Sequence, residues 1–140
     1  MAEVVRFSVS LEGELLEAFD RYCEANRFPT RSEAIRQLLR EALTRQAWEA
    51  GSGEVAATLT LVYDHHRARL SDRLLEIQHR HTDVVVASSH VHLDHENCLE
   101  VIFLRGRPDV LREIASQLRA LKGIRKGELV VASPSGHGHP

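Results

Sequence analysis

The sequence predicts an α+β chain of two units, a strand-helix-helix unit that pairs with a second copy and a βαββαβ sandwich of the ferredoxin-like kind. Three observations predict this fold class. Apolar and polar residues alternate over residues 4–11, two helical repeats follow as far as residue 47, and the Gly-Ser-Gly of residues 51–53 separates these from four strand patterns and two helical patterns. The order of the later patterns is typical of a sheet with helices on one face.

Composition excludes several classes of protein. The chain has 140 residues, of which 43% are hydrophobic, which suits one modest core or two very small ones. Its formal net charge of −2 does not indicate a nucleic-acid or membrane partner, so any contact with DNA must be local. Because the sequence has no apolar run that could span a bilayer and no recognisable signal peptide, we expect a cytoplasmic protein whose two cysteines stay reduced.

The first expected element is a strand over residues 4–11, "VVRFSVSL". One of its faces is apolar, and the other carries Arg6, Ser8 and Ser10. A single strand with two short helices leaves its own edges unpaired and buries too little surface to offset chain entropy. We therefore expect an obligate dimer, in which two antiparallel copies of the strand form a ribbon that fits the major groove of DNA.

Two helices follow this strand and are separated by the turn "NRFP". Cys23 lies on the apolar face of the first helix, so we expect a small core residue there. Thr30, followed three residues later by Glu33, is typical of a capping box and indicates where the second helix begins. The sequence thus predicts one DNA-binding unit over residues 1–47.

A short flexible linker is expected over residues 48–53, where the helical pattern is lost and glycine appears. The second domain spans residues 54–132, and we expect residues 133–140 to be a disordered tail. Its elements are expected to be strand 54–63, helix 67–80, strand 83–92, strand 98–104, helix 108–121 and strand 124–132.

The stretch "HVHLDHENC", residues 90–98, is the most distinctive part of the sequence. If the flanking strands form a hairpin with a loop of residues 93–97, Cys98 lies opposite His92 and Glu100 lies opposite His90. The four side chains then share one face of the sheet, and two imidazoles and a thiolate can converge on one cation. Glu100 could orient a ligand without binding the ion.

One ligand of the usual four is missing from this set. "QHRHTD" offers His79 and His81 at the end of the helix that leads into the same hairpin. The cysteine excludes magnesium and calcium, which prefer oxygen ligands; zinc prefers a tetrahedron, whereas nickel(II) and copper(II) accept a square plane. The residues alone do not choose among these metals.

The remaining histidines more often belong to a solvated surface or a tail than to a metal site. They are His65, His66, His95, His137 and His139. His65 and His66 stand beside Asp64 and could hold a second, weaker ion. We assign these five no functional role from the sequence.

Nearly the whole chain resembles the NikR-type nickel-responsive transcriptional regulators. "RFSVSL" is similar to the DNA-reading strand of their ribbon-helix-helix domain, and "RSEAIR" to the start of its second helix. "QHRHTD" and "SSHVHLDHENCLEV" resemble the nickel-binding segments of their regulatory domain, which has a ferredoxin-like, ACT-like fold. Of these motifs, "RSEAIR" is shared by many unrelated ribbon-helix-helix proteins, whereas "HVHLDHENCLE" is specific.

The resemblance implies a homotetramer that binds double-stranded operator DNA in response to nickel and represses nickel uptake. It implies that His90, His92 and Cys98 bind nickel from one subunit and that His79 is donated by its neighbour. Arg6, Ser8 and Ser10 fall on the family's base-contacting positions.

The family often holds an auxiliary cation between its domains. Glu33 matches one of the residues that bind it, but Gln37 stands where a second acidic residue is usual. A neutral amide is a weaker ligand for a hard cation, so this departure puts the auxiliary site in doubt.

Three other functions remain open from the residues. The same architecture could sense zinc, cobalt or copper, or the second domain could bind a small molecule instead of a metal. A metal-dependent hydrolase would need a general base, and only Glu100 is placed for that role. We therefore expect a regulator and not an enzyme.

Overall fold

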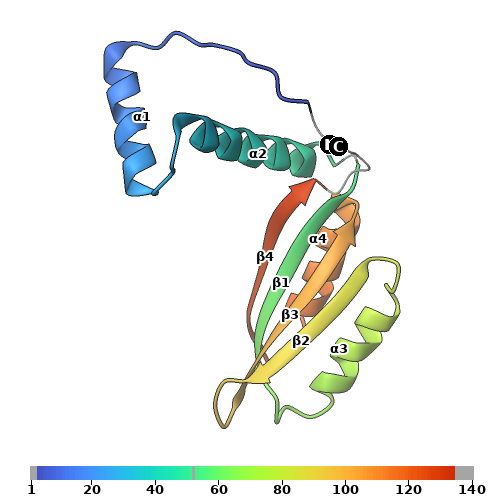
Figure 1. The fold of residues 1–140 in the computed structure, drawn as a ribbon. Helices are drawn as coiled ribbons and strands as arrows, with labels where there is room; N and C mark the ends of the chain where they lie inside the picture. The colour runs from blue at the N-terminus through green and yellow to red at the C-terminus, as the bar shows by residue number, and fades with distance from the viewer. Residues whose placement is uncertain (1–2, 52, 135–140) are drawn as a thin grey trace. The chain divides into compact units, whose positions relative to one another are not determined.

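The computed structural model describes residues 3–51 and 53–134 (Figure 1). Contacts divide the described residues into two compact units, one ending at Ala42 and the other beginning at Leu43. In chain order the elements are α1 (Gly13–Ala25), α2 (Arg31–Ala50), β1 (Val55–Asp64), α3 (Leu70–His79), β2 (Val85–His92), β3 (Asn97–Gly106), α4 (Pro108–Arg119) and β4 (Ile124–Pro134).

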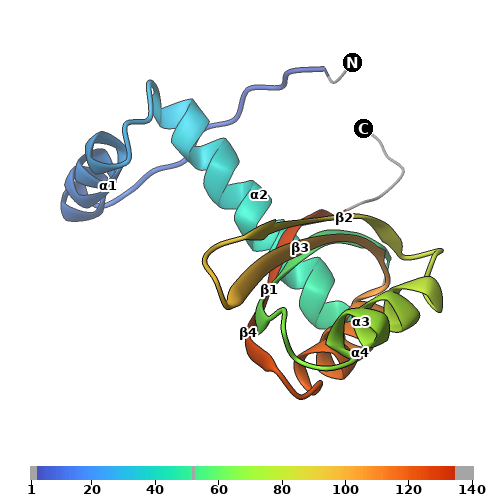
Figure 2. The same ribbon diagram turned by 90° about the horizontal axis from the view of Figure 1, so that it is seen from below.

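The second unit is a four-stranded sheet with the strand order β2-β3-β1-β4, in which every neighbouring pair is antiparallel. Helices α3 and α4 lie side by side on one face of this sheet (Figure 2). This confirms the predicted βαββαβ sandwich. The strand order also places β2 at an edge, so one side of the β2-β3 hairpin is open.

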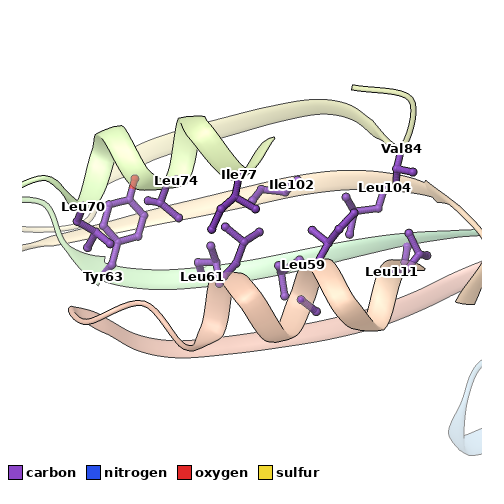
Figure 3. Packing of buried hydrophobic residues seen from close by; sticks show 14 of the residues in the cluster. Leu59, Leu61, Tyr63, Leu70, Leu74, Ile77, Val84, Ile102, Leu104 and Leu111 are labelled. Atoms are coloured by element: carbon purple, nitrogen blue, oxygen red, sulfur yellow. The ribbon is translucent and has the colours of Figure 1, made fainter. Parts of the chain in front are cut away.

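The core lies between the helices and the sheet (Figure 3). Burial alternates along the whole of β1, so that every second side chain enters the core and the others face away. The largest fully buried side chains are Leu59, Leu61, Leu70, Leu74, Ile102, Leu104, Leu111, Ile114 and Leu118. Their removal from water supplies most of the stabilisation of this unit.

The outer face of the sheet is open and partly apolar. Val91, Phe103 and Val130 are large apolar residues on different strands, and all three are exposed. Phe103 and Val130 both pair with Thr58 on the central strand, so they lie on the same face. An exposed apolar face of this kind is typical of a surface that packs against another protein.

In the N-terminal unit, a left-handed residue at Arg27 helps the chain to turn between α1 and α2. The guanidinium of Arg31 donates two hydrogen bonds, of 2.9 and 2.8 Å, to the carboxylate of Asp20 and ties α2 to α1. The hydroxyl of Thr30 accepts a hydrogen bond from the backbone N–H of Glu33 at 3.1 Å, as the capping pattern predicted. Cys23 is buried, which confirms its expected place in the core.

Residues 4–11 form no strand in the single chain, although the sequence predicts one there. Their alternation is present, but Val5, Phe7 and Val9 are 79%, 71% and 62% exposed. The physical reason is that a strand forms its ladder of hydrogen bonds with a neighbour, and one copy of the chain offers none to this segment.

Several boundaries differ from the sequence prediction. Helix α3 begins at Leu70 rather than at residue 67, because a turn from Asp64 leads to Arg69 in the left-handed conformation. Helix α2 continues to Ala50, so half of the expected linker of residues 48–53 is helical. Strand β4 ends at Pro134 and takes in the first two residues of the expected tail, while residues 135–140 lie outside the described residues.

The other strands and α4 differ by a few residues at their ends. Strand β2 begins two residues later than predicted, β3 extends from 97 to 106 and α4 ends two residues earlier. No helix in the described part of the chain is long and apolar enough to cross a membrane.

Candidate metal centre

The register of the β2-β3 hairpin is the one that the sequence predicted. Cys98 pairs with His92, and Glu100 pairs with His90. Directly paired residues of antiparallel strands point to the same side of a sheet, so these four residues share a face. That face is the one that carries the helices, because Ile102, two residues beyond Glu100 on the same strand, lies in the core.

The carboxylate of Asp94 holds the hairpin loop. It accepts hydrogen bonds from the backbone N–H groups of Asn97 and Glu96, at 2.8 and 2.9 Å. These bonds, that of Asn97 first, hold the pKa of Asp94 below its usual range. Arg125 of β4 donates a further hydrogen bond, of 2.8 Å, to the side-chain oxygen of Asn97. The loop length, and with it the pairing of Cys98 with His92, is thereby fixed locally.

The four residues differ in depth because their strands differ in position. Cys98 and Glu100 lie on an inner strand and are 2% and 6% exposed. His90 and His92 lie on the edge strand, and both are exposed. Their ring centroids are 6.3 Å apart. The hairpin therefore presents one buried thiol beside two accessible imidazoles.

Glu100 is a buried carboxylate with two side-chain donors. The hydroxyl of Tyr63 on β1 donates to Oε1 at 2.8 Å, and the amide of Gln78 on α3 donates to Oε2 at 3.1 Å. Burial, followed by the hydrogen bond and the charge of Glu100, raises the pKa of Tyr63 well above its usual value. The ring of Tyr63 points into the core below α3 (Figure 3). This network joins β1, β3 and the end of α3.

His79 is the last residue of α3 and directly follows Gln78. Its side chain is exposed. Among the described residues of one chain, no three His, Cys, Asp or Glu side chains form a set that could hold a metal ion. The structure therefore places His90, His92 and Cys98 on one face but does not gather them with His79 into a complete site. His81 lies in the turn after α3, where its carbonyl accepts hydrogen bonds from Val84 and Val85.

A second group of histidines lies beside His92. The Nε2 atoms of His65 and His66 are each 2.9 Å from the carbonyl oxygen of His95. The ring of His65 meets His92 edge-on, with 4.6 Å between centroids. The sequence placed His65 and His66 beside Asp64 but did not place His95 or His92 near them, because the contacts between the two loops are not visible in the sequence.

Tyr63 and Gln78 were also missed by sequence reasoning. A signal for both was present. Tyr63 falls on the buried face of β1 by strict alternation, and Gln78 follows Leu74 by four residues on the buried side of α3. A polar group at such a position needs a partner in the core. His137 and His139 lie outside the described residues.

The residues expected to contact DNA are exposed. Arg6, Ser8 and Ser10 alternate with the apolar side chains of the N-terminal segment. Glu33, the expected ligand of an auxiliary cation, forms a salt bridge with Arg36 one turn later. Gln37 donates a hydrogen bond to Glu41 at 3.3 Å. The carboxylate of Glu33 is thus already paired with a cation of its own helix.

The donor types at the hairpin fit a d-block metal ion. Thiolate sulfur and imidazole nitrogen are preferred by nickel, zinc and copper, whereas magnesium and calcium prefer oxygen. Two imidazoles and one thiol from a single hairpin leave at least one position for a further ligand.

Two families match the chain, one over each unit. The ribbon-helix-helix protein family, copG type, matches residues 5–46. The NikR C terminal nickel binding domain matches residues 56–132. Together the two matches cover most of the sequence, and the second includes every residue of the candidate metal centre.

Close relatives match over nearly their whole length. One from Nitratidesulfovibrio vulgaris strain DP4 is 50% identical over 129 residues, which are 92% of this chain and 93% of the relative. One from Pyrococcus abyssi is 46% identical over 131 residues, which are 94% and 95% of the two chains. Both carry the provisional name of nickel-responsive regulator.

One solved structure supports the fold of the second unit alone. An uncharacterized protein from Thermotoga maritima superposes with a TM-score of 0.51 at 15% sequence identity. The superposition covers 56% of this chain and 96% of that one.

The buried network gives a testable prediction for stability. Replacing Gln78 with leucine leaves Oε2 of Glu100 without its donor inside the core, so we expect Gln78→Leu to lower the free energy of unfolding by about 1–3 kcal/mol. Urea denaturation measures this difference. Gln117→Leu is the matched control, because the amide of Gln117 donates its hydrogen bond of 3.0 Å to Glu113, which is exposed. Equal losses in the two variants would contradict a structural role for the network.

Proposed function

The chain belongs to the family of NikR-type nickel-responsive transcription regulators, and from this premise we propose which residues bind nickel and DNA and how the two are coupled. His90, His92 and Cys98 bind the ion from one subunit. His79 of a neighbouring subunit completes the set. The nickel-bound protein lies in the cytoplasm and represses genes of nickel uptake.

The single observation that carries this proposal is the register of the hairpin. Because Cys98 pairs with His92, the two imidazoles and the thiol share one face, and a shift of one residue would separate them. His79 is exposed at the end of its helix, where it is available to a second chain. An incomplete set of donors in one chain and an accessible fourth donor favour a site shared between subunits.

Glu100 supports the site without binding the ion. Both of its carboxylate oxygens accept hydrogen bonds, from Tyr63 and from Gln78. Gln78 adjoins His79, and Glu100 lies two residues from Cys98, so the network sets the end of α3 relative to β3. Partners of this kind commonly orient metal ligands and fix their position.

Two exposed apolar surfaces support an assembly of four chains. Val5, Phe7 and Val9 can be covered by the antiparallel pairing of two N-terminal segments. The outer face of the sheet, with Phe103 and Val130, offers a second surface for another copy. We propose a homotetramer in which the unit that ends at Ala42 binds DNA and the unit that begins at Leu43 senses the metal and forms the tetramer.

DNA recognition follows from the paired segments. Once two segments form a ribbon, its polar face presents Arg6, Ser8 and Ser10 twice. An arginine can form a bidentate pair with guanine, and serine can contact either type of base. Two such ribbons in one tetramer bind two half-sites, and the first contact raises the effective concentration for the second.

Nickel binding and DNA binding are coupled because nickel shifts an equilibrium between arrangements of the subunits that exist without the metal. A nickel ion shared by two subunits supplies a bond that only one arrangement of those subunits can make. That arrangement is thereby favoured over the others. The ordered end of α3 and the regulatory domains then hold both ribbons for simultaneous contact.

A gel-shift assay on promoter DNA from beside this gene tests the proposal. We expect a retarded band with nickel and no band, or a much weaker one, without it. Parallel samples with zinc, cobalt and copper separate a nickel regulator from a sensor of another metal. Equal retardation with and without every metal would refute metal-dependent binding.

Cys98→Ala is expected to abolish tight nickel binding while the tetramer persists, because the thiolate is lost but the apolar surfaces remain. Equilibrium dialysis and the thiolate-to-nickel absorption band measure the loss, and size-exclusion chromatography measures the assembly. Cys23→Ala is the control, since Cys23 is a core residue of the other unit. Retention of the band in Cys98→Ala would contradict the assignment.

Arg6→Ala is expected to weaken the binding of operator DNA by about 1–3 kcal/mol per half-site and to leave nickel binding unchanged. Arg6→Lys separates base recognition from contact with phosphate, because lysine keeps the charge but lacks the planar fork. We expect the lysine variant to lose nearly as much affinity as the alanine variant. Full affinity in Arg6→Ala would show that the ribbon is read differently.

A further inference from the structure

The last two turns of α2 belong to the regulatory unit. The boundary between the two compact units lies between Ala42 and Leu43, inside the helix and well before Gly51. Ala47 and Trp48 pack against the hydrophobic core of the regulatory unit. The glycines that sequence analysis took for a flexible linker therefore connect two segments of the same unit, the end of α2 and the start of β1.

Helix α2 ends at Ala50 and is followed by Gly51, whose φ of +70° is the left-handed conformation common after a helix C-terminus. Its last turn contains no basic side chain. The final carbonyl groups of a helix have no partner within it, and they carry the negative end of the helix dipole. A positively charged donor from elsewhere in the chain can therefore stabilise this end of α2 further.

Arg112 of α4 supplies that donor. Its guanidinium donates a hydrogen bond of 3.0 Å to the carbonyl oxygen of Trp48. The guanidinium carbon also lies 4.2 Å from the centroid of the indole ring. One side chain thus binds both the backbone and the ring of Trp48, across 64 positions of sequence. The planar guanidinium of arginine suits this combination, because it can lie over an aromatic ring while it donates a charged hydrogen bond.

We propose that Arg112 and Trp48 form a clamp that fixes the last two turns of α2 to the regulatory unit and keeps α2 a continuous helix across the boundary between the two units. The inference rests on the proposed function, because it concerns the binding of two half-sites by one tetramer. Arg112 is a positioning residue that need not touch nickel or DNA.

The expected effect follows from the length of the tether. With the clamp released, the last two turns of α2 can detach from the regulatory unit, and residues 43–50 then lengthen the connection between the two units. Effective concentration falls as a flexible connection lengthens, so we expect binding to two half-sites to weaken by about tenfold. Binding to one half-site does not depend on the tether and stays unchanged.

The test compares Arg112→Ala with Arg107→Ala in the nickel-loaded protein. Arg107 directly precedes α4, and its side chain donates a hydrogen bond of 3.4 Å to the exposed Asp109. Trp48 is the only tryptophan of the chain, so its fluorescence reports on the clamp alone. Trypsin cleavage after Arg45 measures whether the last turns of α2 open. DNA binding is measured with promoter fragments that contain one or two half-sites, whose positions are located by footprinting.

We expect Arg112→Ala to increase quenching of Trp48 by acrylamide, to speed cleavage after Arg45 and to weaken binding to two half-sites about tenfold. The Arg112→Ala variant should bind nickel and a single half-site as the wild type does. The Arg107→Ala variant should match the wild type in every measurement. Trp48→Phe, which keeps the packing and the backbone bond, should show an intermediate cleavage rate.

Three results would overturn the clamp. They are unchanged quenching and cleavage in Arg112→Ala, an equal loss of affinity for one and for two half-sites, and a Trp48→Phe variant that is cleaved no faster than the wild type. A wild-type protein that binds no promoter DNA with nickel refutes the proposed function instead. The fluorescence and cleavage measurements would still decide whether the clamp exists.

Discussion

The pairing of Cys98 with His92 is the constraint on which the site depends. Side chains alternate between the faces of a sheet, so a slip of one residue in the hairpin would move the thiol away from both imidazoles. Two features oppose this slip. Asp94 fixes the loop through the backbone N–H groups of Glu96 and Asn97, and β3 is held in the sheet by β1 on its other side. A metal-binding face thus follows from an ordinary element of sheet geometry.

The position of each strand within the sheet determines which site residues are buried and which are accessible. The inner strand buries Cys98 and Glu100, whereas the edge strand leaves His90 and His92 accessible. A buried carboxylate is tolerated because Tyr63 and Gln78 satisfy both of its oxygens. The same bonds tie the end of α3 to the sheet. His79 lies at this end of α3, and we propose that it binds the nickel ion held by a neighbouring subunit.

Both units leave apolar surface uncovered, the first on its N-terminal segment and helices and the second chiefly on the outer face of its sheet. The N-terminal segment has the alternation of a strand but no neighbour, and the outer face of the sheet has no second layer. A single copy of the chain therefore leaves apolar surface that a second copy can cover. Regulation through assembly is a natural use of such a molecule, because subunit contacts can be strengthened by a shared ligand.

The amino-acid sequence alone determined the local order of this protein. Alternation over residues 54–63 fixed β1, and the count of residues between His92 and Cys98 fixed the register of the hairpin, because both depend on neighbours along the chain or across one short loop. Tertiary structure decided what distant residues do. The bonds of Glu100 to Tyr63 and Gln78, the group of His65, His66 and His95, and the contact of Arg112 with Trp48 join residues far apart in sequence. Periodicity places a side chain on a face, but only packing selects its partner, since many side chains on that face have the same local pattern.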